Sequence, residues 1–301
     1  MSDTDRNTYL ASLTAGACVD HRGTPFSAPL LTSLLNALRD PSTQSPHLSD
    51  ARLDEAQFYG EADFGQTTFF GDAAFRGARF YGGAKFAKAE FRGAARFDGT
   101  QFDGNAHFGE AQFLGDAWFG DARFSRDTGF NWVRFSRDAW FNRARFSGQA
   151  WINQAQFAGT AGFDGAHFHG EAGFGQTQFE GTAGFRRAEF DGDAGFREAQ
   201  FSEMAGFDGA RFHGDARFGK TQFAGSARFG QAQFDGDARF DGAHFDGDAT
   251  FGPAQFSGGA WFGKTQFAAS ARFGQAQFDG DARFDGAHFD GDATFDGVQF
   301  T

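Results

Sequence analysis

The sequence predicts an all-β solenoid with a small helical cap at its N-terminus. Three observations carry this prediction. Phenylalanine recurs from Phe58 to Phe300 at alternating steps of six and five residues, a small residue precedes nearly every phenylalanine by two positions, and glycine stands in most of the longer steps. Among 301 residues there are 46 Phe and 44 Gly. At a fixed spacing, such a bias is typical of a repeat protein rather than of a disordered tract.

Each small residue and the phenylalanine after it form the inward side of a predicted strand. In extended backbone, residues i and i+2 point to the same side, so Ala62 and Phe64 point inward while Asp63 points outward. Steps of five and six residues do not keep one face of a helix. The unit also recurs before an ordinary strand could run on. We therefore predict short extended faces separated by corners, as in a solenoid.

Glycine is expected to form the corners of the six-residue steps, because it accepts the positive φ that a tight corner often needs. Four six-residue steps carry another residue at this place, and their corners are predicted to be strained or differently turned. These residues are Arg126, Arg137, Glu203 and Ala269.

Residues 1–47 lack the repeat and are predicted to be an N-terminal helical cap, with the solenoid over residues 48–301. Ser27 and Pro29 precede a leucine-rich run that stops at Pro41, which indicates a capped helix. A weaker helix is expected over residues 5–13. Because the open end of a solenoid needs a cover, we expect these helices to supply it.

The small-x-Phe unit, repeated more than forty times over residues 48–301, resembles the pentapeptide-repeat family. This resemblance implies a right-handed quadrilateral β-helix with four units per coil. The present sequence departs from strict five-residue units because every second unit has six. One coil should then have about 22 residues, with the longer corners diagonally opposite and each Phe stacked on the next coil's Phe at the spacing of paired strands.

Charge and cysteine content limit the classes of partner and compartment. The net charge of −12 argues against direct binding of nucleic acid. The single cysteine, Cys18, excludes internal disulfides and fits a reducing compartment. No apolar run is long enough to span a membrane, and the first residues do not resemble a signal peptide. We expect a cytoplasmic protein with no membrane contact.

No catalytic, cofactor or metal motif is found in the sequence. The eight histidines show neither HxxxH nor Cys/His metal spacing and are expected to be outward surface residues. Corners such as Asp235-Gly236-Asp237 are expected to be solvated rather than to bind calcium. No Ser/His/Asp set or carboxylate pair can be singled out, and a rod without inserted loops offers no cleft. We predict a protein that is not an enzyme and needs no cofactor.

One stretch is a candidate protein-binding site because it concentrates tryptophan and arginine, the residues most enriched at binding hot spots. Its candidate residues are Trp118, Arg123, Arg126, Trp132, Arg134, Arg137, Trp140, Arg145 and Trp151. The alternative is that tryptophan covers exposed strands while arginine balances nearby aspartate.

A run of glycines occupies every second outward position from Gly162 to Gly206 and is predicted to leave two opposite faces of the rod flat. A flat face could let a partner pack closely, or the glycines could simply result from copying of the repeat.

The favoured function is a non-catalytic scaffold that binds a protein partner of unknown identity. The family suggests an alternative, because some of its members mimic DNA, bind DNA gyrase, and inhibit it or protect it from quinolones. Arginines at outward positions late in the chain, such as Arg217 and Arg239, interrupt the acidic surface that this alternative needs. A homodimer through the last coil, around Phe289, Phe295 and Phe300, is also predicted.

Overall fold

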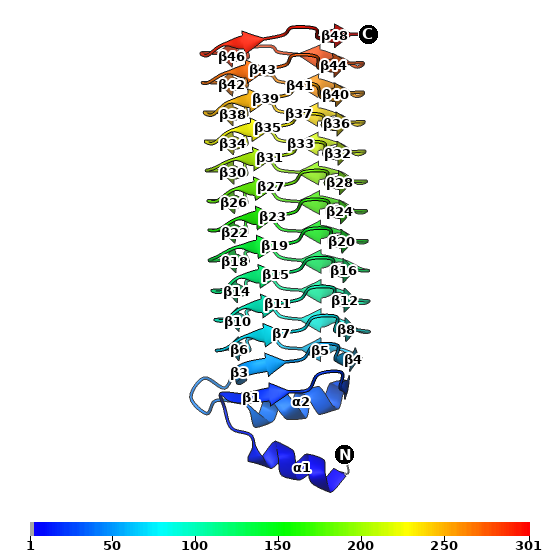
Figure 1. The fold of residues 1–301 in the computed structure, drawn as a ribbon, viewed down its shortest axis with the longest axis vertical. Coiled ribbons are helices and arrows are strands. Elements are labelled where there is room, and N and C mark those ends of the chain that lie inside the picture. Colours follow the sequence, from blue (N-terminus) through cyan, green and yellow to red (C-terminus); the bar gives the residue numbers. More distant parts are fainter. Residues whose placement is uncertain (1–2) are drawn as a thin grey trace.

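A straight rod of stacked coils, with two helices at one end, forms the computed structural model, which describes residues 3–301 (Figure 1). Each strand pairs in parallel with the strand one coil away. On β5 (Ala62–Asp63) and β9 (Ala84–Lys85), for example, Ala62 pairs with Ala84 and Asp63 with Lys85. The coil therefore has 22 residues, and the predicted all-β solenoid is confirmed.

The rod has four faces, each named after its first two-residue strand and containing every fourth strand from there on. The β5 face ends at β45 (Ala282–Arg283), the β6 face runs from β6 (Thr68–Phe69) to β46 (His288–Phe289), the β7 face from β7 (Ala73–Ala74) to β47 (Ala293–Thr294), and the β8 face from β8 (Arg79–Phe80) to β48 (Gln299–Phe300). Five-residue steps join the β5 to the β6 face and the β7 to the β8 face. The six-residue corners are therefore diagonally opposite, as predicted.

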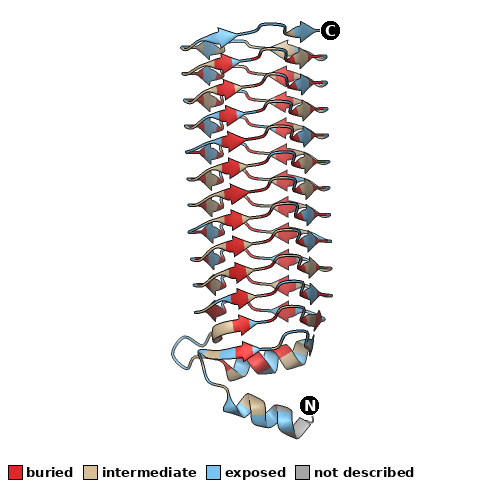
Figure 2. Ribbon diagram, viewed as in Figure 1, coloured by how far each residue is buried: buried red, intermediate tan, exposed pale blue. Residues whose placement is uncertain are grey.

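Phenylalanine rings and small side chains fill the interior, and the buried positions run in lines along the rod (Figure 2). Rings one coil apart stack, as Phe185 does on Phe207 with centroids 4.8 Å apart and planes at 3°. Rings from opposite faces meet edge to face, as Phe174 and Phe185 do at 5.4 Å and 89°. Both arrangements are favoured by the ring quadrupole, so the ring contacts add to the stability that each Phe gains from burial. Ile152, the one replacement in the series, is also buried.

Threonine replaces the small inward residue at several positions, and most of these buried hydroxyls have a partner. Thr177 Oγ1 donates to the carbonyl oxygen of Ile152 at 2.6 Å, and Thr221 Oγ1 donates to that of Phe196 at 2.7 Å. Thr67 differs, since its buried Oγ1 has no hydrogen-bond partner. A buried threonine hydroxyl is therefore hydrogen-bonded in some coils and without a partner in another.

The prediction that six-residue corners need a positive φ is wrong for most of them. Gly60 has a φ of 88°, but most residues with positive φ lie in the five-residue corners, and many are not glycine, such as Gln66 at 58° and Trp132 at 57°. Glycine serves the six-residue corners for another reason, because successive corners stack closely. A Cβ on Gly104 would lie 2.5 Å from the carbonyl carbon of Gly82. None of the four non-glycine residues at this place has a positive φ.

Aspartate and asparagine side chains complete the hydrogen bonding of the corners. Asp138 Oδ1 accepts from the backbone N–H of Thr160 at 2.8 Å, and Asn153 Oδ1 accepts from that of Gly175 at 2.8 Å. Each acceptor lies one coil before its donor. Such groups need a partner when they leave the sheet. Part of the acidic composition is thus used for backbone pairing.

The N-terminal segment contains two strands as well as two helices. β1 (Ala17–Asp20) pairs with β3 (His47–Arg52), and β2 (Pro25–Ser27) pairs with β4 (Gln57–Tyr59). Phe26 accordingly stacks on Phe58 at 5.3 Å. The repeat pattern did not predict these strands, because Phe26 and Phe58 are 32 positions apart rather than 22. The extra residues include α2 (Ala28–Ala37), which leaves the coil after β2.

α2 is the capped helix that the sequence predicts. The Ser27 hydroxyl accepts from the N–H of Leu30 at 3.3 Å, and the buried side chains include Leu31, Leu34 and Leu35. α1 (Asp3–Ser12) corresponds to the weaker helix expected over residues 5–13, and it lies at the end of the rod (Figure 1). Within the part of the chain that the structure describes, no helix has the length and apolar character needed to cross a membrane.

Candidate functional site

The nine predicted binding residues surround the rod instead of forming one patch. Trp118 on β15 (Ala117–Trp118) and Trp140 on β19 (Ala139–Trp140) are neighbours on the β7 face. Arg123 and Arg145 are paired on the β8 face, on β16 (Arg123–Phe124) and β20 (Arg145–Phe146).

The remaining five of these residues are spread over faces and corners. Arg134 is on the β6 face and Trp151 on the β5 face, on β18 (Arg134–Phe135) and β21 (Ala150–Trp151). Arg126, Trp132 and Arg137 lie in three different corners. A single partner surface therefore contains only some of the nine.

Two of the tryptophans lie close to their own face, whereas Trp132 projects from its corner. The guanidinium of Arg96 lies 4.8 Å from the ring centroid of Trp118, a cation–π contact. The ring of Trp140 lies above Gly162 in the next coil, where a Cβ would be 2.6 Å from Trp140 Cε3. Trp132 is 61% exposed, which makes it the most accessible of the three.

A shallow groove of about 500 Å³ runs along the β5 face, next to Trp132 and Trp151. The residues that line it define the β5-face groove: Asn153, Gly173, Gly175, Gly195, Arg197, Arg217, Gly219, Lys220, Arg239 and Asp241. Trp151 pairs with Gly173 of β25 (Ala172–Gly173), so the groove begins where this tryptophan ends. A second hollow, lined by Trp132, shares Asn153, Gly175 and Arg197 with it. The glycines that the sequence predicts to flatten this face form its floor.

The rim of the β5-face groove is cationic although the chain is acidic. Arg197, Arg217, Lys220 and Arg239 line the groove against a single carboxylate, Asp241. These cations also have acidic neighbours. Arg217 Nη2 lies 2.7 Å from Asp193 Oδ2, and Arg239 Nη2 lies 3.0 Å from Asp237 Oδ2. Exposed ion pairs of this kind contribute little to stability, so a carboxylate of a partner can replace them.

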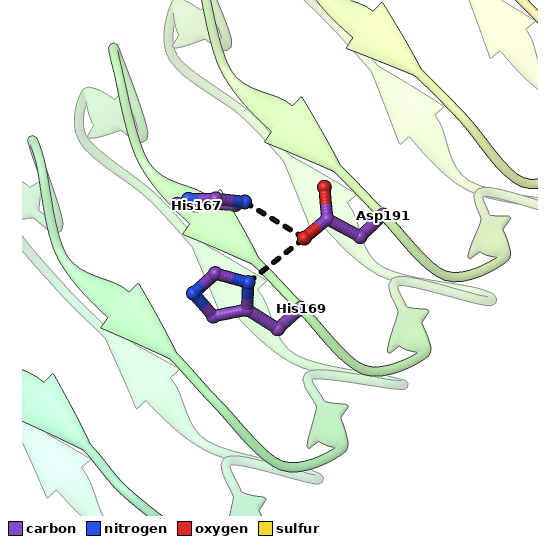
Figure 3. A group of neighbouring side chains, drawn as sticks. All are labelled: His167, His169 and Asp191. Carbon is purple, nitrogen blue, oxygen red and sulfur yellow. Dashed lines mark hydrogen bonds and ion pairs between the residues drawn. The ribbon is translucent and has the colours of Figure 1, made fainter.

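Histidine and carboxylate side chains gather on the β8 face and the corner after it. His167 lies on β24 (His167–Phe168), and His169 follows two residues later on the same side. Both rings are directed at one oxygen of Asp191 in the next coil, with distances of 3.0 Å from His167 Nε2 and 2.8 Å from His169 Nδ1 (Figure 3). His213, a further coil on, lies 2.6 Å from Asp235 Oδ2 and 3.4 Å from Glu189 Oε1.

The hydrogen bonds of this cluster shift two of its pKa values. Partial burial alone would raise the pKa of Asp191, but the hydrogen bonds from His169 and His167 outweigh it, so the pKa lies below its usual range. The hydrogen bond between His213 and Asp235 raises the pKa of His213. This cluster was not predicted from the sequence, because its histidines show neither HxxxH nor Cys/His metal spacing. The signal is His-x-His at 167–169, followed one coil later by Glu189-x-Asp191.

The residues predicted for dimerisation lie on the last coil. Phe289 is half-buried, whereas Phe295 and Phe300 are 42% and 67% exposed. Phe295 and Phe300 each stack on one side only, on Phe273 and Phe278. Homodimerisation stays a prediction.

The comparisons with known proteins agree with the repeat geometry. A family model described as pentapeptide repeats matches residues 44–90, 86–131, 130–178, 174–222, 207–255 and 254–299. Neither the search of curated proteins nor that of solved structures gives a match. The family suggests a repeat scaffold or a role in protein interaction and is generally not enzymatic. Because the matched segments cover most of the chain, the chain belongs to the pentapeptide-repeat family.

Proposed function

We propose that this protein is a non-catalytic scaffold that binds a partner protein along the β5-face groove. The observation that carries the proposal is a glycine floor beside a cationic rim, with Trp132 and Trp151 at one end. The glycines allow another backbone to approach closely. The tryptophans are residues that typically anchor a bound partner.

The charge of the rim selects the kind of segment that fits. Four cations stand against Asp241 in a groove on a protein whose net charge is −12. An extended segment with acidic side chains would complement the rim, and arginine can hold a carboxylate with two parallel hydrogen bonds. The rest of the acidic surface would repel such a segment, so binding is confined to this face.

Site-specific photo-crosslinking in cells that naturally make the protein tests this proposal. A photoreactive residue at Arg197 is expected to capture a defined protein, whereas the same residue at Gln233 on the β8 face is not. With the captured protein purified, Arg217→Glu should weaken binding, while Arg123→Glu on the β8 face should not. Equal capture from both positions, or equal binding by both glutamate variants, would refute the groove.

DNA gyrase is a second candidate partner, favoured by a ladder of four acidic residues in successive coils. Glu171, Asp193, Asp215 and Asp237 follow one another at one corner, where they could imitate a line of phosphates. Asp193, Asp215 and Asp237 are each paired with arginine, which reduces the charge available. A supercoiling assay with and without a fluoroquinolone tests this candidate. Inhibition or drug protection that Asp215→Asn and Asp237→Asn weaken would support it, and no effect at micromolar protein would exclude it.

A homodimer through the last coil is the third part of the proposal. The exposed rings of Phe295 and Phe300 would be covered by a second copy. Sedimentation of the full chain should give twice the monomer mass, and Phe300→Asp should give the monomer mass. A monomer mass for the unaltered chain at every concentration would rule the dimer out.

A further inference from the structure

Three side chains of the β8-face cluster present metal-ligand atoms to one another. His167, His169 and Asp191 each offer one ligand atom, a ring nitrogen or a carboxylate oxygen, and these three atoms all lie within 4.8 Å of one another. The geometry points to a binding site for one transition-metal ion of the zinc class, held by these three residues (Figure 3). Such a site is separate from the β5-face groove and does not depend on the protein-binding proposal.

The distances between the donor atoms fit a first-row metal ion. At Zn–N and Zn–O bond lengths of about 2.1 Å, two donors of a tetrahedral centre lie about 3.4 Å apart. The two imidazole nitrogens lie 3.0 and 2.8 Å from the same oxygen of Asp191. These distances are slightly shorter than the tetrahedral spacing, so rotations of the three partly exposed side chains are expected to seat an ion between them.

The solenoid holds the three residues in this arrangement. β24 pairs with β28 (Glu189–Phe190), so that His167 faces Glu189 and Phe168 faces Phe190. The N–H of Asp191 donates to the carbonyl oxygen of Phe168 at 2.8 Å, which fixes the start of the corner relative to the histidines. A site on a rigid frame binds its ligand more tightly because less conformational entropy is lost on binding.

The donor set favours a transition metal over calcium or magnesium. Two imidazoles and one carboxylate suit zinc, copper or nickel, whereas calcium and magnesium prefer oxygen ligands alone. Arg145 and Arg211 flank His167 and Glu189 on the same face, and their positive charge opposes any cation, so binding has to rest on the imidazole donors. Glu189 Oε2 lies 3.9 Å from His167 Nε2 and is the nearest candidate for a fourth ligand.

A second triad, Glu189, Asp191 and His213, shares Asp191 with the first. Two metal ions, one in each triad, would have to share the negative charge of the Asp191 carboxylate, so we expect one ion per chain. The first triad offers two imidazoles rather than one, and imidazole is the better ligand for this class of metal. His213 is moreover already engaged with Asp235. It therefore supplies a matched control within the same cluster.

Calorimetric titration of the full chain with Zn²⁺ tests the site. The protein is made without a polyhistidine tag, treated with EDTA and dialysed, and one Zn²⁺ per chain is expected to bind. His169→Ala and Asp191→Ala should each weaken binding by at least about tenfold, since even the loss of an outer partner of a metal ligand costs about 10–100-fold. His213→Ala and Cys18→Ser should bind as the unaltered chain does. Mg²⁺ should give no saturable heat.

Cobalt provides a measurement that does not depend on affinity alone. Co²⁺ bound by the unaltered chain should show the visible absorption of a site with imidazole ligands, and His169→Ala should lose it while keeping the thermal midpoint. The proposal is overturned if Zn²⁺ gives no saturable heat or if His169→Ala binds as tightly as the unaltered chain. Equal losses in His213→Ala and His169→Ala would also overturn it, because the ion would then not belong to the first triad.

Discussion

The indole of Trp140 covers Gly162 of the next coil, leaving no room there for a methyl group. A Cβ at Gly162 would lie 2.6 Å from Trp140 Cε3 and 3.0 Å from Cζ3. Gly162→Ala is therefore expected to displace the indole and lower the free energy of unfolding by about 1–3 kcal/mol, the usual range for overpacking. Thermal and urea denaturation measure the loss, and acrylamide quenching reports the greater exposure of tryptophan.

Gly206→Ala is the matched control on the same face. A Cβ there would have its nearest contact at 3.8 Å, with Arg186 Cγ, so the methyl group fits. Alanine also restricts the unfolded chain more than glycine does, so stability should be unchanged or slightly higher. If both variants were equally destabilised, the effect would belong to the glycine positions in general and not to Trp140.

Two buried threonines at equivalent positions are expected to respond in opposite directions to valine. Thr177→Val removes a hydroxyl that donates to the Ile152 carbonyl oxygen at 2.6 Å, and we expect a loss of about 1–2 kcal/mol. Thr67→Val removes a buried hydroxyl without a partner, and stability should stay equal or rise by up to about 1 kcal/mol. Valine has nearly the same shape, and Val133 already occupies such a position. Urea denaturation of both variants checks the contrast, and equal losses would contradict it.

The coil was predictable from the sequence because one repeated unit determines it locally and globally. Phe64 and Ala62 set the inward side of a strand. The alternating steps, together with the four units per coil that the family resemblance implies, set strand pairing at 22 residues. β1 and β2 were not predictable in this way. Phe26 belongs to the same stack as Phe58, but α2 separates them in sequence and conceals the period.

The candidate sites were less predictable because they depend on how four faces are arranged around the rod. Trp118 and Trp140 share one face because they lie one coil apart, whereas Trp132 and Arg145 of the same stretch lie elsewhere. The β5-face groove combines residues from Asn153 to Asp241, which composition alone does not group. Its floor was visible as outward glycines, whereas its cationic rim appears only once the coils are stacked.

Asp138 is expected to stabilise its corner through a hydrogen bond rather than through its charge. Its Oδ1 accepts from the N–H of Thr160 at 2.8 Å. Asp138→Ala leaves this half-buried N–H without its acceptor and should cost about 1–2 kcal/mol. Asp138→Asn keeps an oxygen in the same place and should cost clearly less. Thermal denaturation distinguishes the two, and equal losses would show that the charge is what matters.

Acidification is expected to loosen α1 from the end of the rod through His21. The ring of this residue lies between Tyr9 and Phe26, with centroid distances of 5.4 Å to both, and Tyr9 Oη lies 2.9 Å from its Nε2. Burial lowers the pKa of His21, and the nearby Asp20 offsets this only in part. The folded cap therefore favours the neutral ring.

The sign of the pH effect follows from this lowered pKa. When the pH is above the unfolded-state pKa of about 6.5, His21 is neutral in both states, so its ionisation does not change the stability of the cap. As the pH falls below that value, the unfolded cap binds a proton that the folded cap resists, so the stability of the cap decreases until the lower folded-state pKa is reached. Hydrogen exchange of the α1 amides, corrected for intrinsic rates, should thus be faster at pH 5 than at pH 7.5. His21→Phe should remove this dependence and His47→Phe should keep it, whereas protection that is the same at both pH values would refute the role of His21.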